Sequence, residues 1–277
     1  MFNFDIKNTL LRRIFLTTTL FFAVTAVSII GGRDARAAVI DLGFALDKSG
    51  SIAFGGDCGG VGCYKLAKEA LANALGTIPT GGTDQYRVGV VSFDGSADTV
   101  VAPTIVTAAS IGAIQAAINS DNFDAGGTAI HAGIDKLVAD FDAAPGGLNS
   151  LALMNVVTDG QSSQSALLAS SADAFDAGWT GLSFECVGSD CDPGDLADAS
   201  FPNSPGDIIA SGGAVPDPIT QGFVLQVVSF DTDFEAALTS KIQAIVKPPA
   251  VPVPAAVWLF GTALIGFIGV SRRRKVA

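Results

Sequence analysis

Three oxygen-bearing side chains lie on alternate residues near the start of the chain. Asp47, Ser49 and Ser51 directly follow an apolar run, residues 38–45, that has the composition of a buried strand. One carboxylate and two hydroxyls on a tight loop are hard oxygen ligands of the kind that Mg²⁺ prefers. The same pattern also suits a turn that caps a helix, so by itself it leaves both interpretations open. A position at the carboxyl end of a strand favours a ligand site, because open α/β sheets bind ligands at that edge.

Two later segments add oxygen donors of the same kind. Thr128 follows a pair of glycines just before a stretch with helical periodicity. Asp159 comes directly after residues 151–158, which read as a second buried strand. A hydroxyl and a second carboxylate are therefore available to complete a metal site with the first loop.

Taken together, the three motifs resemble the metal-ion-dependent adhesion site of the von Willebrand factor type A domain. The resemblance covers roughly residues 38–246. It implies that an ion, Mg²⁺ or else Mn²⁺ or Ca²⁺, is bound by the hydroxyls of Ser49, Ser51 and Thr128. Asp47 and Asp159 would hold the ion directly or through water. In this family the ion grips a carboxylate of an incoming ligand. The resemblance therefore implies a protein or polysaccharide ligand that offers a carboxylate.

Strand-like and helix-like segments alternate along the same part of the chain. This order predicts an α/β fold of three layers, a Rossmann-like, doubly wound and mainly parallel sheet with helices on both faces. Residues 99–105 follow their predecessor so closely that an antiparallel edge strand is expected there. Residues 188–217 are expected to form a long loop with one helical turn. The expected strands are 38–45, 86–93, 99–105, 151–158, 180–187 and 223–230, and the expected helices are 64–78, 108–119, 128–141, 162–177 and 234–246.

Catalytic chemistry has little support in the sequence. His131 is the only histidine, so a zinc centre with several histidines is excluded. No Gly-x-Ser-x-Gly nucleophile motif is present, although the spacing leaves a Ser-His-Asp triad through His131 open. We expect a binding module and no enzyme. A structural component of an extracellular matrix, without metal-dependent ligand binding, is the alternative.

The first 37 residues have the features of a signal peptide. A basic start is followed by an apolar stretch, residues 14–30, and by the small-x-small sequence Ala35-Arg36-Ala37. Cleavage is expected after Ala37, and an uncleaved membrane anchor is the alternative. Export of the chain also fits its cysteine content.

The last 31 residues combine a Pro-rich linker, 247–254, with a tail, 255–277, that joins an apolar run to a basic end. This order resembles a PEP-CTERM sorting tail. The resemblance implies a Gram-negative host, transient anchoring in the inner membrane, an exosortase-type processing enzyme, and delivery to the cell surface or extracellular matrix. A plain C-terminal anchor is the alternative. Where many members have Pro-Glu-Pro, this chain has Val251, Pro252, Val253 and Pro254.

Four cysteines form two pairs with equal spacing, Cys58 with Cys63 and Cys186 with Cys191. The spacing suits either two disulfide bonds or one four-cysteine zinc site. Export favours disulfides, paired locally, although crossed pairing stays open. Both pairs are expected in loops at the carboxyl edge of the sheet, where they would fix the rim that a partner touches.

The part of the chain between the two tails is strongly acidic. It carries 25 acidic residues against 7 basic ones, a net charge of −18. Such a surface repels phosphates, which excludes nucleic acid as a partner.

Overall fold

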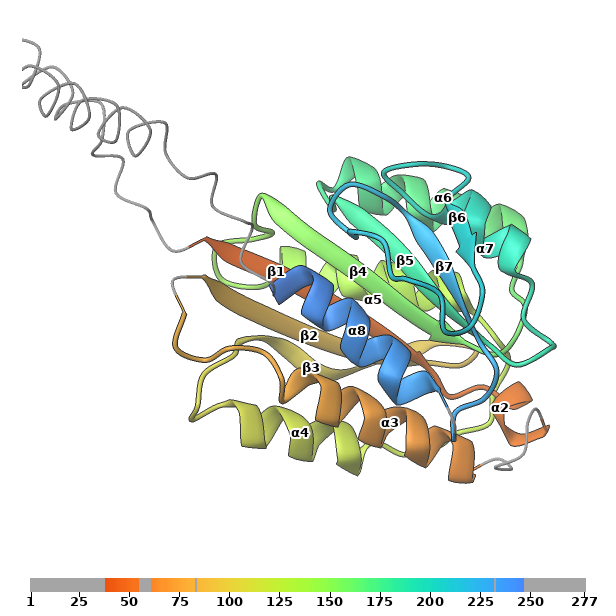
Figure 1. Ribbon diagram of the computed structural model, residues 1–277, viewed down its shortest axis with the longest axis horizontal. Helices are drawn as coiled ribbons and strands as arrows, with labels where there is room; N and C mark the ends of the chain where they lie inside the picture. Colours follow the sequence, from red (N-terminus) through yellow and green to blue (C-terminus); the bar gives the residue numbers. More distant parts are fainter. Residues whose placement is uncertain (1–37, 55–60, 83, 232, 247–277) are drawn as a thin grey trace, which may run out of the picture. The chain divides into compact units, whose positions relative to one another are not determined.

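A seven-stranded sheet forms the middle layer of the protein (Figure 1). The computed structural model describes residues 38–54, 61–82, 84–231 and 233–246. The strand order is β3-β2-β1-β4-β5-β7-β6, and β3 is antiparallel to β2 whereas the other neighbours are parallel. The predicted α/β fold, including its antiparallel edge strand, is confirmed.

The elements alternate along the described chain much as predicted. The strands are β1 (Val39–Asp47), β2 (Gln85–Phe93), β3 (Ala97–Ile105), β4 (Leu151–Thr158), β5 (Gly181–Val187), β6 (Asp207–Ile209) and β7 (Phe223–Val227). The helices are α2 (Ser51–Phe54), α3 (Val61–Leu75), α4 (Ile111–Ser120), α5 (Ile130–Asp142), α6 (Gln164–Asp176), α7 (Pro193–Ala199) and α8 (Phe234–Val246).

Helices cover both faces of the sheet and create two separate apolar cores. The core on one face includes side chains of α3, α4 and α8, and the core on the other includes side chains of α5, α6 and α7. Strands β1, β2, β4 and β5 are buried along nearly their whole length, because helices shield them on both sides. This explains why these strands read as continuous apolar runs in the sequence.

The α5 face of the sheet depends on glycines in the strands. A Cβ atom at Gly43 would lie 2.7 Å from the indole of Trp179, and one at Gly89 would lie 2.5 Å from the ring of Phe141. The two aromatic rings meet edge to face, with their centroids 5.0 Å apart. Glycine is therefore needed in β1 and β2 for these rings to reach the sheet.

Two elements lie inside the predicted long loop, and one predicted strand is too long. Helix α7 begins after Asp192, whose side chain accepts hydrogen bonds from the backbone N–H groups of Gly194 and Asp195. Pro193 occupies the first turn of this helix. Strand β6 has only three residues, and its extended backbone is held by pairing with β7. Strand β7 ends at Val227 rather than at Phe230, because Asp233 accepts from the backbone N–H groups that follow.

The predicted targeting segments lie outside the described residues. This applies to residues 1–37 with the cleavage site after Ala37, and to residues 247–277 with the sequence Val251-Pro252-Val253-Pro254. Within the described ranges, none of the helices has the length and apolar character needed to cross a membrane.

A buried ion pair ties the last helix to the centre of the sheet. Lys241 of α8 lies 2.6 Å from a carboxylate oxygen of Glu185 in β5, and both side chains are almost completely buried. The ammonium group also donates to Asn155 of β4 and lies 4.9 Å from the centre of the Phe223 ring. Burial lowers the pKa of Lys241, and the nearby Glu185 acts in the opposite direction. Removing one member of the pair would leave the other charge buried in the protein interior without a counter-ion.

We therefore expect Lys241→Met to lower the free energy of unfolding by about 3–5 kcal/mol, because Glu185 loses its counter-ion. The double variant Lys241→Met/Glu185→Gln should recover most of this loss. The matched control is Lys65→Met, which breaks an exposed pair with Glu69 and should cost less than about 1 kcal/mol. Chemical denaturation followed by circular dichroism measures all three. Equal stability of Lys241→Met and the control would contradict the assigned role.

Candidate metal centre

Two carboxylates meet at the carboxyl edge of the sheet because β1 and β4 are adjacent and parallel. The pairing of Leu46 with Val157 brings the last residue of β1, Asp47, beside the end of β4. Asp159 follows β4 directly, and both carboxylates are buried, with residue exposures of 1% and 5%. The sheet register therefore places two negative groups in one small volume.

Three hydroxyls lie with these carboxylates. The Ser49 and Ser51 Oγ atoms are 2.8 Å apart, and the Thr128 hydroxyl donates to Ser49 over 3.1 Å. Ser51 donates to the Asp159 Oδ1 atom over 2.8 Å. The backbone N–H of Ser49 donates to the Asp47 Oδ1 atom over 2.7 Å. The structure thus brings all five predicted ligand residues into one hydrogen-bonded cluster.

Thr158 is a further member of the site that the sequence analysis missed. Its hydroxyl donates to the Asp47 Oδ2 atom over 2.6 Å and accepts from the backbone N–H of Gly160 over 3.2 Å. It therefore orients the Asp47 carboxylate from the neighbouring strand. Its position directly before Asp159, at the end of a predicted strand, could have marked Thr158 as a candidate. Its contact with Asp47 could not be predicted, because it depends on the register between β1 and β4.

Backbone hydrogen bonds hold the two hydroxyl-bearing loops together. The N–H of Gly50 donates to the carbonyl of Gly126 over 2.8 Å, and the N–H of Ala125 donates to the carbonyl of Lys48 over 3.2 Å. A Cβ atom at Gly126 would lie 2.4 Å from the Asp94 carboxylate. The glycine at this position is therefore required for the close approach of the loop to the end of β2.

The electrostatics of the cluster favour a bound cation. Burial raises the pKa of Asp47 to about 7, although hydrogen bonds from Ser49 and Thr158 act in the opposite direction. Burial also raises the pKa of Asp159 to about 6. The Asp159 Oδ2 atom is buried and finds no hydrogen-bond partner among the described residues. A divalent cation would supply the missing partner and favour the ionised form of both carboxylates.

The donor set fits a small, hard cation. Mg²⁺ takes oxygen ligands, and hydroxyl and carboxylate oxygens are the groups present here. No group of three or more His, Cys, Asp or Glu residues that can hold a metal occurs in the described part of the chain. An ion at this place therefore needs further oxygens besides the two carboxylates, and the hydroxyls of Ser49, Ser51 and Thr128 are in position to supply them.

The described cysteines form disulfides, so the four-cysteine zinc site is wrong. Cys186 and Cys191 are joined by a bond of 2.05 Å, which also excludes crossed pairing for these two residues. Cys63 is disulfide-bonded as well, and its expected partner Cys58 lies outside the described residues. The expectation that all four lie in loops is also wrong. Cys63 lies in the first turn of α3, and Cys186 lies within β5 because its backbone pairs with β4 and β7.

The comparison with known families agrees with this arrangement of fold and site. The model of the von Willebrand factor type A domain matches residues 41–190, just over half of the chain, and the protein therefore belongs to this family. No curated protein matches the chain.

Solved structures share the fold at low identity. Proximal thread matrix protein 1 (PTMP1) from the mussel byssus, in a structure with a zinc-occupied MIDAS motif, is 18% identical, with a TM-score of 0.57 over 78% of this chain and 48% of that chain. The pilus adhesin SpaC from Lactobacillus rhamnosus GG is 17% identical, with a TM-score of 0.55 over 76% and 31%. A von Willebrand factor type A protein from Catenulispora acidiphila is 20% identical, with a TM-score of 0.51 over 76% and 42%. The protein thus spans less than half the length of these chains, and the likeness establishes the common fold.

We expect Asp47→Asn to change how stability depends on pH. In the metal-free wild type, the native carboxyl keeps its proton up to a pH of about 7, because burial raises its pKa, whereas an unfolded Asp loses it near 3.8. Stability contributed by Asp47 is therefore lost as the pH rises through this range. The amide side chain of the variant does not ionise, keeps an acceptor for the Ser49 N–H and can donate to Thr158. In EDTA at pH 8 the variant should melt at a higher temperature than the wild type.

The same variant should lose the response to metal. Added Mg²⁺ should raise the melting temperature of the wild type and of Asp176→Asn, an exposed control on α6, but not that of Asp47→Asn. Thermal denaturation at pH 5 and pH 8, with EDTA or Mg²⁺, gives all the comparisons. A melting temperature of Asp47→Asn that rises with Mg²⁺ as in the wild type would refute the assignment of Asp47.

Proposed function

We propose that the protein is an exported, non-enzymatic binding module that holds its ligand through a divalent cation, and that it is displayed at the cell surface or in the extracellular matrix. The observation that carries this proposal is the cluster of three hydroxyls between two buried carboxylates at the open edge of the sheet. Mg²⁺ takes six oxygens, and five candidate side chains leave room for an oxygen of the ligand.

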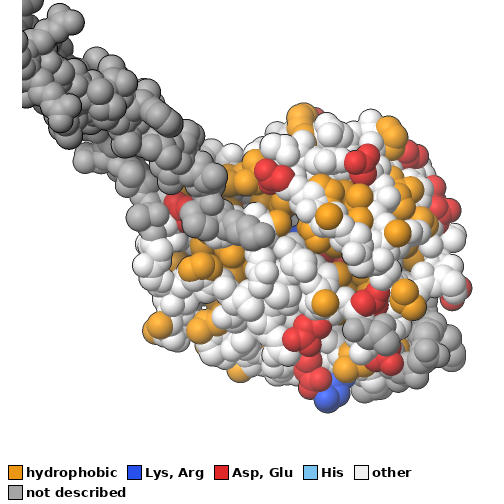
Figure 2. All heavy atoms as spheres, viewed as in Figure 1, with side chains coloured by type: hydrophobic (Ala, Val, Ile, Leu, Met, Phe, Trp, Pro, Cys, Tyr) orange, Lys and Arg blue, Asp and Glu red, His pale blue; other side chains and the backbone are white. Residues whose placement is uncertain are grey.

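The charges of the site favour a ligand that carries a carboxylate. Only Asp47 and Asp159 are charged among the five candidate ligands, so a divalent ion keeps part of its attraction for another anion. The rest of the surface is unfavourable for such a ligand. Figure 2 shows acidic side chains scattered over one face of the molecule and very few basic ones. Binding of an acidic protein or polysaccharide should therefore depend on the ion.

The similar structures support this proposal at the level of the fold. One of them, PTMP1, is described with a zinc-occupied MIDAS motif, and another, SpaC, is described as a pilus adhesin. For the present chain we propose Mg²⁺, with Mn²⁺ or Ca²⁺ as alternatives.

A catalytic role is disfavoured by the surroundings of His131. Its Nδ1 atom is buried and makes no hydrogen bond to the described residues. The hydroxyls of Ser49 and Ser51, the serines of the cluster, form their hydrogen bonds with other groups. No hydrogen bond joins either serine to His131 in the described part of the protein, so the contact with which a Ser-His mechanism begins is not formed.

A structural role in an extracellular matrix is the second candidate. The similarity to PTMP1, described as a matrix protein of the byssal thread, favours it. Metal dependence separates the two candidates, because a domain used only as a packing unit needs no ion to bind its neighbours.

Thr128→Val tests the binding role, because it removes one hydroxyl and keeps the shape of the side chain. We expect at least a tenfold loss of Mg²⁺ affinity by calorimetry, about 1.4 kcal/mol. The control is Thr99→Val, because the Thr99 hydroxyl donates to Asp140, away from the cluster.

Binding of the wild type to the extracellular matrix of the producing cells should require Mg²⁺ and be lost in EDTA. Matrix binding that EDTA leaves unchanged would favour the structural role.

The disulfides support export, because such bonds persist in oxidising compartments. We propose that the signal peptide is removed after Ala37, and that an exosortase-type enzyme at the inner membrane removes the tail near Pro254. Mass spectrometry of the native surface protein should find a mature chain from about residue 38 to about residue 254. Neutral residues in place of Arg272, Arg273 and Arg274 should impair processing. An intact peptide that reaches Arg272, in protein retained by the inner membrane, would instead show a plain anchor.

A further inference from the structure

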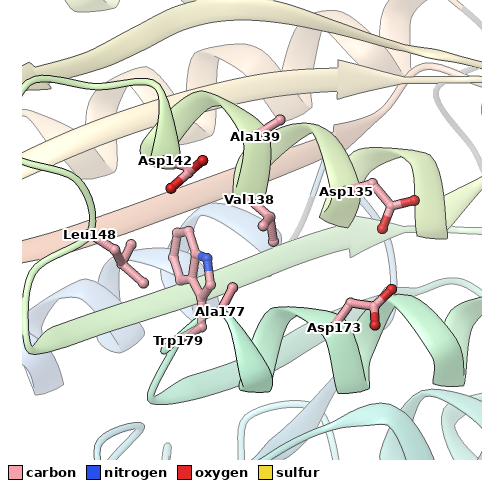
Figure 3. Close-up of a pocket in the computed structure, with 8 residues that line it drawn as sticks. All are labelled: Asp135, Val138, Ala139, Asp142, Leu148, Asp173, Ala177 and Trp179. Atoms are coloured by element: carbon pink, nitrogen blue, oxygen red, sulfur yellow. The ribbon is translucent and has the colours of Figure 1, made fainter.

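A cavity of about 450 Å³ lies between α5 and α6 (Figure 3). Its floor includes Leu148, just before β4, and Trp179, just before β5. This part of the cavity is therefore at the amino ends of the strands, whereas the metal centre is at the carboxyl ends. The eight residues of β4 separate these two places by roughly 26 Å.

Three aspartates surround this cavity. Asp135 and Asp142 come from α5, and Asp173 comes from α6 (Figure 3). All three are exposed, and none has an ion pair or a side-chain hydrogen bond with a described residue. Lys136, the lysine of α5, pairs with Asp140 instead. The negative charge around the cavity is therefore uncompensated within the described part of the protein.

The three carboxylates do not converge on one point. The described residues contain no group of three such side chains placed to hold a single metal ion. Asp135 and Asp142 are two helical turns apart, which separates them by about 10 Å along α5. Between them the lining is apolar, with Val138, Leu148 and Trp179. This arrangement suits two separate cationic groups on apolar stems better than one metal ion, which needs several oxygens around it.

Trp179 adds a second, independent indication of a ligand. Its side chain is largely buried, with an exposure of only 2%, and one edge of its ring packs against Phe141. The indole N–H has no acceptor among the described residues, and its nitrogen is not among their fully buried unpaired atoms, so it is open to solvent in the cavity and available to a ligand. Figure 3 shows the indole nitrogen on the side of the ring near Val138, within the cavity. A ligand here needs a hydrogen-bond acceptor as well as positive charge.

We propose that this cavity binds a basic peptide segment of a partner protein. Two Lys or Arg side chains of the segment meet the carboxylates at the two ends, and a backbone carbonyl between them accepts from the Trp179 N–H. A segment in the polyproline II conformation has three residues per turn and advances about 3.1 Å per residue, so side chains three positions apart project from the same side about 9 Å apart. The segment therefore has the pattern Lys-x-x-Lys or its Arg equivalent. The site works without the metal centre.

The test uses the full-length chain with Trp258→Phe, which leaves Trp179 as the only tryptophan. In EDTA, the probe peptide acetyl-Lys-Ala-Ala-Lys-amide should give a saturable shift of the Trp179 indole N–H signal in a ¹H–¹⁵N spectrum. Acetyl-Lys-Lys-Ala-Ala-amide, of equal charge, should bind at least fivefold more weakly. No shift with either peptide, or equal affinity for both, would overturn the proposal. In samples without EDTA, an equal indole shift with spermidine or with CaCl₂ would also overturn it, because these cations carry no carbonyl.

Matched charge variants show whether the cavity itself is responsible. Asp135→Asn/Asp142→Asn should lower the affinity for the first peptide at least tenfold. The control, Asp176→Asn/Asp198→Asn, removes the same charge from two other exposed positions and should change the affinity less than twofold. Equal losses in the two double variants would show general attraction to an acidic surface and refute the proposed site.

Discussion

The burial of two carboxylates side by side is the constraint on which this structure depends. Asp47 and Asp159 end neighbouring parallel strands, and burial raises the pKa of both groups toward neutrality. A hydrogen bond from Thr158 and one from the Ser49 backbone offset part of the cost for Asp47. Asp159 has only Ser51 and keeps an oxygen without a partner among the described residues. A bound cation would therefore offset the remaining cost of burying the two carboxylates.

The fold serves this site by bringing three loops to one edge of a rigid sheet. The register between β1 and β4 positions the carboxylates, and backbone hydrogen bonds between the loops position Ser49 and Thr128. Helix α5 begins two residues after Thr128 and packs closely on β1 and β2. The same helix contributes Asp135, from its middle, and Asp142, its last residue, to the acidic cavity beside Trp179. Helix α5 thus borders both of the proposed sites, the one for an acidic ligand held through a cation and the one for a basic peptide segment.

Much of the fold follows from local sequence, because long buried strands and amphipathic helices have strong periodic signals. The boundaries predicted for β4 and α8 agree with the structure, and the resemblance to a known family named all five residues of the cluster. Features that need tertiary pairing were missed. Strand β6 depends on β7, Cys186 belongs to a strand through its neighbours, and Thr158 reaches Asp47 only across the sheet. The cavity joins residues of α5, α6 and two loops, so no local pattern predicts it.

Crystals grown with Mn²⁺ offer the most direct test of the metal centre, because anomalous scattering locates manganese without assumptions about its ligands. We predict one strong peak bonded to the hydroxyl oxygens of Ser49, Ser51 and Thr128, between Asp47 and Asp159, and no such peak in crystals of Asp47→Asn. A wild-type map without a peak at this position, in which the three hydroxyls still bond to one another, would contradict the account.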